Sequence, residues 1–180
     1  MDVADPAWNM KINAVIYYLT RKSRVKMMGV TLQNLYHNFW SQFPLYPVVI
    51  FHDDYRTSDE AYLRRQVPLM PLYFEKIKFE LPVVLRGVEL PERTKCSYSS
   101  STLGYRHMCT FHAGGVHDYF LGRHGKSMKT KVPQFPLQEV EYFMRQDDDG
   151  VITSPVGYDL FKFMKVNNKK YGFISSLADE

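Results

Sequence analysis

Three neighbouring segments establish the architecture: NAVIYYLT at residues 13–20, VKMMGVTLQNLYHNFW at 25–40 and PVVIFHDD at 47–54. The first and last segments are short and rich in β-branched and aromatic residues, which is typical of buried strands. Between them, apolar residues recur every three or four positions, which predicts an amphipathic helix that Gly29 weakens only slightly. The chain therefore begins as strand, helix and strand.

The same alternation continues along the rest of the chain. A helix is predicted to begin at residues 58–60, and LYFEKIKF at 72–79 alternates apolar and charged residues as a strand does. Residues 99–102 can cap a long helix at 103–121, which has a weak point at its paired glycines, Gly114 and Gly115. The other predicted elements are a loop at 81–95, a basic loop at 122–136, a strand at 140–145, a helix at 158–168 and a strand at 170–176. This order predicts one α/β domain, with a mainly parallel sheet covered by helices on both faces.

Composition excludes several classes of protein. Of the 180 residues, 45% are hydrophobic, which is enough for one packed core. The net charge is only +4, which does not indicate a nucleic-acid binder, because such proteins usually carry a concentrated basic stripe. No apolar run approaches the ~20 residues that span a bilayer. The start, MDVADPAWNM, lacks the basic and apolar regions of a signal peptide. The 13 Tyr and 12 Phe suit a packed core and also a site that binds a base or a sugar.

Two acidic clusters follow predicted strands. Asp53 and Asp54 come after the second strand, and Asp147, Asp148 and Asp149 come after the fourth. Ligands of open α/β sheets bind at the carboxyl ends of the strands, and adjacent carboxylates repel one another unless a cation neutralises them. In an extended chain, Asp147 and Asp149 would point to the same side and could hold Mg²⁺ or Mn²⁺ against a diphosphate. The alternative is a solvated acidic turn before a helix.

Basic and histidine residues give weaker signals. Arg21, Lys22 and Arg24 follow the first strand, where they could meet phosphate or could be a solvated loop. Three histidines recur every five residues on the long helix, whereas a helical zinc pair uses a spacing of four; they are His107, His112 and His117. The sequence holds no GxSxG, P-loop or GxGxxG motif.

Longer stretches resemble one known family. They are NAVIYYLTRKSRV, NFWSQFPLYPVVIFHDD, IKFELP, CSYSSSTLGYRHMCTFHAG and YDLFKFMKVNNKKYGF, and they span nearly the whole chain. In this order they resemble glycosyltransferase family 15, the yeast-type Golgi α-1,2-mannosyltransferases. The resemblance implies a GT-A fold, a GDP-mannose donor and a Mn²⁺ ion. It also implies transfer of mannose, with retention of configuration, to mannose-containing glycans of glycoproteins in the Golgi lumen.

The resemblance also assigns site residues. The family's acidic metal motif, typically Glu-Pro-Asp, matches Asp147, Asp148 and Asp149, so Asp147 and Asp149 are the expected metal ligands. Arg21 and Arg24 match the loop near the nucleotide, and Asp147 would also lie against the donor. Three residues match a motif of the donor pocket, namely Tyr105, Arg106 and His107.

The resemblance also sets expectations for the extent of the chain. Family members are type II membrane proteins whose N-terminal membrane anchor has no counterpart here, and their catalytic domain continues for a comparable length beyond the fifth strand. Residues 1–180 are therefore expected to be one partial GT-A domain, with the catalytic carboxylate beyond it. The alternative is a degenerate or truncated fragment that binds a nucleotide sugar or a glycan without catalysis.

The two cysteines, Cys96 and Cys109, lack zinc-site spacing. A residue that is cysteine in many family members is Ser154 here, which leaves the family's disulfide pattern undecided. A bridge between Cys96 and Cys109 is one hypothesis, and two buried thiols are the other.

Overall fold

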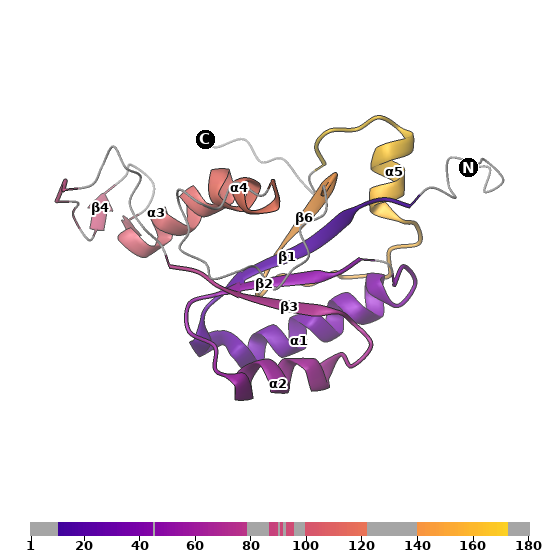
Figure 1. The fold of residues 1–180 in the computed structure, drawn as a ribbon, viewed down its shortest axis with the longest axis horizontal. Coiled ribbons are helices and arrows are strands. Elements are labelled where there is room, and N and C mark those ends of the chain that lie inside the picture. Colours follow the sequence, from indigo (N-terminus) through magenta and orange to yellow (C-terminus); the bar gives the residue numbers. More distant parts are fainter. Residues whose placement is uncertain are drawn as a thin grey trace.

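The computed structural model describes residues 11–44, 46–78, 87–89, 91, 93–95, 100–121 and 140–172. Its main sheet has four parallel strands in the order β3 (Leu72–Lys76), β2 (Val48–His52), β1 (Ala14–Thr20) and β6 (Tyr142–Asp147). The predicted parallel sheet is confirmed. Because all four strands run the same way, their carboxyl ends share one edge of the sheet, to the left in Figure 1.

Helices cover both faces of this sheet, as the sequence predicts (Figure 1). One face carries α1 (Val25–Leu35), which continues as the π-helical η3 (Tyr36–Trp40), and α2 (Thr57–Gln66). The other face carries a continuous helical segment made of three parts: α3 (Leu103–Thr110), the π-helical η5 (Phe111–Gly115) and α4 (Val116–Phe120). The short elements are η2 (Lys22–Arg24), the antiparallel pair β4 (Arg93–Lys95) and β5 (Ser100–Thr102), and α5 (Leu160–Val166).

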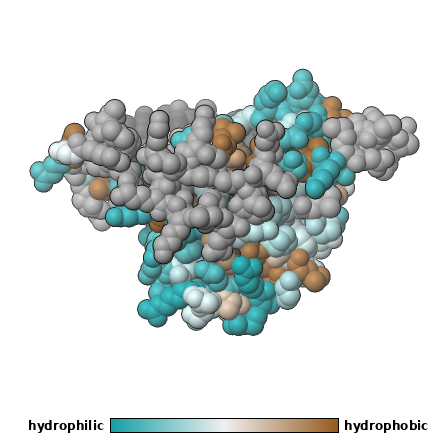
Figure 2. All heavy atoms as spheres, in the orientation of Figure 1, coloured by the Kyte–Doolittle hydropathy of each residue, from teal (hydrophilic) through white to brown (hydrophobic). Residues whose placement is uncertain are grey.

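Two hydrophobic clusters lie on the two faces of β1. Ile16 and Tyr18 pack in the cluster on the side of α1, whereas Val15 and Tyr17 pack in the cluster on the side of α4. All four side chains are at most 2% exposed. This burial explains why the strand sequence shows no polar alternation. The outside of α2 is mainly hydrophilic in Figure 2, and Leu63 is its buried residue.

Helices α1 and α2 pack closely at Gly29. A Cβ atom at this position would lie 3.1 Å from Cε1 of Tyr62, which is closer than most Cβ contacts. The glycine that weakens the predicted helix therefore leaves room for the second helix.

Several predicted boundaries change in the structure. The weak point at Gly114 and Gly115 falls in the π-helical η5, and the basic segment after β1 contains the 3-10 turn η2. Strand β3 ends at Lys76 and not at residue 79, and the charged side chain of Glu75 is buried. Residues 170–172 are not in a strand, and the rest of the predicted strand at 170–176 lies outside the described residues. The same holds for the basic loop at 122–136 and for most of the loop at 81–95.

None of the helices in the described residues is long and apolar enough to cross a membrane.

Candidate functional site

The acidic triplet lies at the shared carboxyl edge of the sheet. Asp147 ends β6 and pairs in register with Leu19, one residue before the end of β1. The chain then turns, because the Gly150 amide donates to the carbonyl oxygen of Asp147 at 2.9 Å. The expectation that Asp147 and Asp149 point to the same side of an extended chain is therefore wrong about the backbone, because the chain is not extended from Asp147 to Asp149. Residues 147–150 are called the acidic turn below.

Asp148 points into the protein from this turn. Its side chain is 12% exposed, and the Thr20 hydroxyl donates to its Oδ2 at 2.6 Å. Nε of Arg24 lies 3.0 Å from the same oxygen. The charge of the inward carboxylate is thus balanced by a guanidinium, as a desolvated charge requires.

Arg24 links this carboxylate to the next one. Its Nη2 lies 2.8 Å from Oδ2 of Asp149, whose side chain is 61% exposed. The hydrogen bond to Asp149 and the charge of Asp148 raise the pKa of Arg24 further above its ordinary value. The predicted site residue Arg24 is therefore in direct contact with the acidic turn.

Asp147 has a different arginine as its partner. Nε and Nη2 of Arg145 donate to its Oδ1 at 2.9 and 2.7 Å, and the Asp147 side chain is 58% exposed. Arg145 is not among the site residues predicted from the sequence. The sequence signal that could have found it is the spacing of two positions between Arg145 and Asp147, because residues two apart on a strand share a face of the sheet.

The second acidic cluster lies beside the same edge, after β2. Oδ1 of Asp53 accepts the Lys22 amide at 2.8 Å, and Lys76 donates to Asp54 at 2.6 Å. The hydrogen bond from Lys76 lowers the pKa of Asp54. Both carboxylates are exposed, and Arg21, just before η2, is exposed as well.

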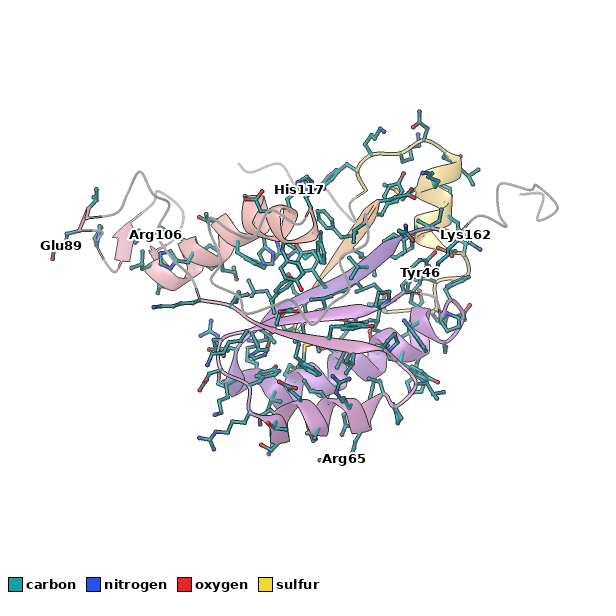
Figure 3. All side chains as sticks on the ribbon, viewed as in Figure 1. Tyr46, Arg65, Glu89, Arg106, His117 and Lys162 are labelled. Carbon is teal, nitrogen blue, oxygen red and sulfur yellow. The ribbon has the colours of Figure 1, made fainter. Side chains whose placement is uncertain are left out.

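The predicted donor-pocket residues lie on α3. The Tyr105 amide donates to Oγ1 of Thr102 at 3.2 Å, which caps the helix as predicted, and the Tyr105 side chain is 56% exposed. The Arg106 guanidinium donates to the Pro91 carbonyl, so this side chain reaches the segment before β4 and not the acidic turn (Figure 3). His107 lies on the same helix and is partly buried.

A partly buried tyrosine–histidine pair lies on the α4 side of the sheet. The Tyr17 hydroxyl is 3.2 Å from Nδ1 of His112, and Tyr17 is in register with Arg145 on β6. Burial, helped by the charge of Arg145, lowers the pKa of His112 to about 4, and burial raises the pKa of Tyr17 to about 12. Both groups are therefore neutral at pH 7. In the sequence, His112 stands out only as a member of the histidine series tested for zinc spacing.

The carboxylates of the acidic turn are of a chemical type that binds divalent cations. Asp147 and Asp149 offer carboxylate oxygens that face outward, and oxygen ligands are those that Mg²⁺ and Mn²⁺ prefer. In the structure each of the two carboxylates forms an ion pair with an arginine. Among the described residues there is no cluster of three or more His, Cys, Asp or Glu that is suited to a metal. The metal site at Asp147 and Asp149 stays a prediction.

Cys109 is a free and exposed thiol. Cys96 lies outside the described residues, so the structure gives the proposed bridge no support. The hypothesis of two buried thiols is wrong for Cys109.

Comparison with known proteins identifies the family. The sequence model of glycosyltransferase family 15, a family described as glycolipid 2-alpha-mannosyltransferase, matches residues 2–180. The chain belongs to this family. The resemblance seen in the sequence is thus confirmed over nearly the whole chain.

Individual relatives agree with this assignment, and solved structures share the fold. Over 79 residues the chain is 43% identical to the probable mannosyltransferase KTR3 of Saccharomyces cerevisiae. This aligned stretch covers 44% of this chain and 16% of KTR3. The X-ray structure of the mannosyltransferase Ktr4p from S. cerevisiae in complex with GDP matches with a TM-score of 0.68 and 19% identity. The match covers 94% of this chain and 42% of that one.

A second solved structure shows the same fold. It is core-mannan synthase A (CmsA/Ktr4) from Aspergillus fumigatus in its Mn/GDP form, with a TM-score of 0.63 and 20% identity over 88% of this chain and 40% of that one. The expected GT-A-type fold is confirmed. The chain spans less than half the length of the curated relatives that it matches.

Proposed function

We propose that this protein acts in the transfer of mannose from GDP-mannose to a mannose-containing glycan acceptor in protein glycosylation. Membership of the mannosyltransferase family supports the reaction, and the Ktr4p structure was solved with GDP. The Mn/GDP form of core-mannan synthase A supports Mn²⁺ as the cofactor. The retaining outcome, the Golgi lumen as location and a membrane anchor before this segment are proposed from the family resemblance.

The observation that carries the proposal is the arrangement of charge on the acidic turn. Two outward carboxylates, Asp147 and Asp149, flank the inward Asp148, and Arg24 contacts both Asp148 and Asp149. We assign Asp147 and Asp149 to Mn²⁺, which when bound would balance the charge of the diphosphate and of the departing GDP. Arg24 and the exposed Arg21 supply guanidinium groups that can bind phosphate oxygens in pairs.

The residues of α3 complete the proposed donor site. Tyr105 exposes an aromatic ring that can pack on guanine or on mannose. Arg106 and His107 precede the π-helical turn on the same helix, and we assign them to the donor pocket as well. We further propose that residues 1–180 form one GT-A domain of a longer glycosyltransferase whose catalytic carboxylate lies outside this chain.

Calorimetry with GDP, with and without Mn²⁺, tests the proposal. We expect GDP to bind in the presence of Mn²⁺, and UDP to bind more weakly. Folded protein that binds GDP under neither condition would overturn the proposal and would favour the alternative in its glycan-binding form, a degenerate fragment that binds a glycan without catalysis.

A matched pair of variants locates the site. Asp149→Asn should weaken Mn²⁺-dependent binding of GDP by about tenfold or more, because it removes one anionic ligand. Asp54→Asn changes an exposed carboxylate that follows β2 and pairs with Lys76, so this variant should bind GDP as the wild type does. Equal affinities of the two variants would contradict the assignment of Asp149.

A further inference from the structure

A row of polar side chains joins the first helix to the acidic turn. Thr31 and Asn34 lie on α1 and Asn38 lies on η3, at spacings of three and four that place them on one side of the helix. Their long-range hydrogen bonds all go to backbone groups of residues 148–156. These three residues are called the polar row.

Thr31 holds the middle of the acidic turn. Its side chain is buried, at 2% exposure, and its hydroxyl donates to the carbonyl oxygen of Asp148 at 3.0 Å. The Met27 carbonyl, one helical turn earlier, lies 3.2 Å from the same hydroxyl. Together with the bond from Thr20, this contact fixes Asp148 through both its main chain and its side chain.

Asn34 and Asn38 hold the chain just after the turn. The Ile152 amide donates to Oδ1 of Asn34 at 2.7 Å, and Nδ2 of Asn34 donates back to the Ile152 carbonyl at 3.1 Å. Asn34 therefore satisfies both backbone groups of Ile152, as a neighbouring strand would. Nδ2 of Asn38 donates to the same carbonyl at 3.1 Å, and the main-chain carbonyl of Asn38 accepts the Val156 amide at 2.8 Å.

We propose that the polar row is made of positioning residues, which set the direction in which the acidic turn presents Asp147 and Asp149 to the metal and the diphosphate. This inference rests on the proposed function. Residue 148 is fixed from the protein side, whereas the carboxylates at 147 and 149 are 58% and 61% exposed. A site that binds a cation needs its ligands held to within roughly 0.5 Å, which a turn gains from bonds to a rigid helix.

Two substitutions at Thr31 separate the hydroxyl from the shape of the side chain. Thr31→Val keeps the shape but loses the donor to Asp148, whereas Thr31→Ser keeps the donor and loses a methyl group. We expect Thr31→Val to weaken Mn²⁺-dependent GDP binding by about three- to tenfold, the effect of one net hydrogen bond, and Thr31→Ser to restore most of the affinity. Asn34→Ala, which removes both bonds to Ile152, should weaken binding by about tenfold or more.

A control separates positioning from general loss of stability. Tyr46→Phe removes a buried hydroxyl that lies 2.7 and 2.9 Å from the two carboxylate oxygens of Asp159, near α5 and away from the acidic turn (Figure 3). Affinity for GDP is measured by calorimetry and affinity for Mn²⁺ by electron paramagnetic resonance, at a temperature where all variants are folded. Tyr46→Phe should lose stability but bind GDP and Mn²⁺ as the wild type does.

The outcomes are distinct. Variants of the polar row that bind Mn²⁺ and GDP as tightly as the wild type would overturn the inference and leave the proposed function standing. A loss of affinity in Tyr46→Phe as large as that in Thr31→Val would also overturn it, since the effect would then follow stability. Wild-type protein that binds no GDP with Mn²⁺ would overturn the proposed function, and the inference with it.

Discussion

At the scale of single residues, burial separates three neighbouring carboxylates that look alike in the sequence. Asp148 is 12% exposed and has Thr20 and Arg24 as partners, whereas Asp147 and Asp149 are mostly exposed. The sequence could predict that the outer two act together, but it assigned no separate role to the middle one. The difference depends on which side chain of β1 faces the turn, and a local pattern does not contain that information.

His52 gives a prediction on pH dependence. It is 3% exposed, its Nδ1 accepts the Tyr55 amide at 2.9 Å, and burial lowers its pKa to about 4. In the unfolded chain a histidine has a pKa of about 6.5, so between about pH 6.5 and 4 the unfolded state binds a proton that the folded state does not. The free energy of unfolding should therefore fall as the pH falls through this window, and this contribution should level off below about pH 4.

The variant His52→Asn tests the source of this dependence. Asparagine keeps an acceptor for the Tyr55 amide but does not titrate, so the variant should lose less stability than the wild type between about pH 7 and about pH 4.5. Chemical denaturation at the two pH values measures the difference. His112 contributes in the same direction in both proteins, because its pKa is also lowered to about 4. An identical loss in both proteins would rule out His52 as a source.

At the scale of elements, the helix over the α4 side gives a prediction from two adjacent glycines. A Cβ at Gly115 would lie 2.9 Å from Cδ2 of Phe111, which is buried against Phe51, whereas a Cβ at Gly114 would meet nothing within 4 Å. Gly115→Ala should lower the free energy of unfolding by about 1–3 kcal/mol through this overlap. Gly114→Ala should leave it unchanged or raise it by up to about 1 kcal/mol, the difference in helix propensity.

Denaturant titrations of the two variants check this prediction. Both substitutions bring the same gain in helix propensity, so their difference reports the contact with Phe111. Equal stability of the two variants would show that η5 adjusts to relieve the overlap with Phe111 without any loss of free energy of unfolding.

The elements that could be predicted are those with a strong local period. β1, α1, β2 and the start of α2 follow from apolar spacing and from the acidic residues at the start of the helix. The contacts of the site were less predictable. Arg145 and Thr31 meet the acidic turn, and Asn34 meets Ile152 just after it, because of the register of β6 on β1 and the packing of α1. Neither the register nor the packing is encoded within a short window of sequence.

At the scale of the whole molecule, ligand binding should raise the melting temperature. GDP with Mn²⁺ would bind the folded state at the carboxyl edge of the sheet, and a ligand at about 100 times its dissociation constant adds about 2.7 kcal/mol to the free energy of unfolding. We expect differential scanning fluorimetry to show a higher midpoint with both together than with either alone, and a smaller rise with UDP. A midpoint that does not move with GDP and Mn²⁺ would contradict binding at the sheet.

The pairing of β1 with β6 also has a consequence for biosynthesis. The bond between Thr20 and Asp148 joins residues 128 positions apart, and the strand at the centre of the sheet is the first to be made. At roughly 5–20 residues per second, a ribosome needs about 6–25 s to supply the second partner of that strand. During this interval one edge of a strongly apolar strand has no neighbour from β6, and an unpaired edge of this kind favours aggregation of the nascent chain until the acidic turn has been translated.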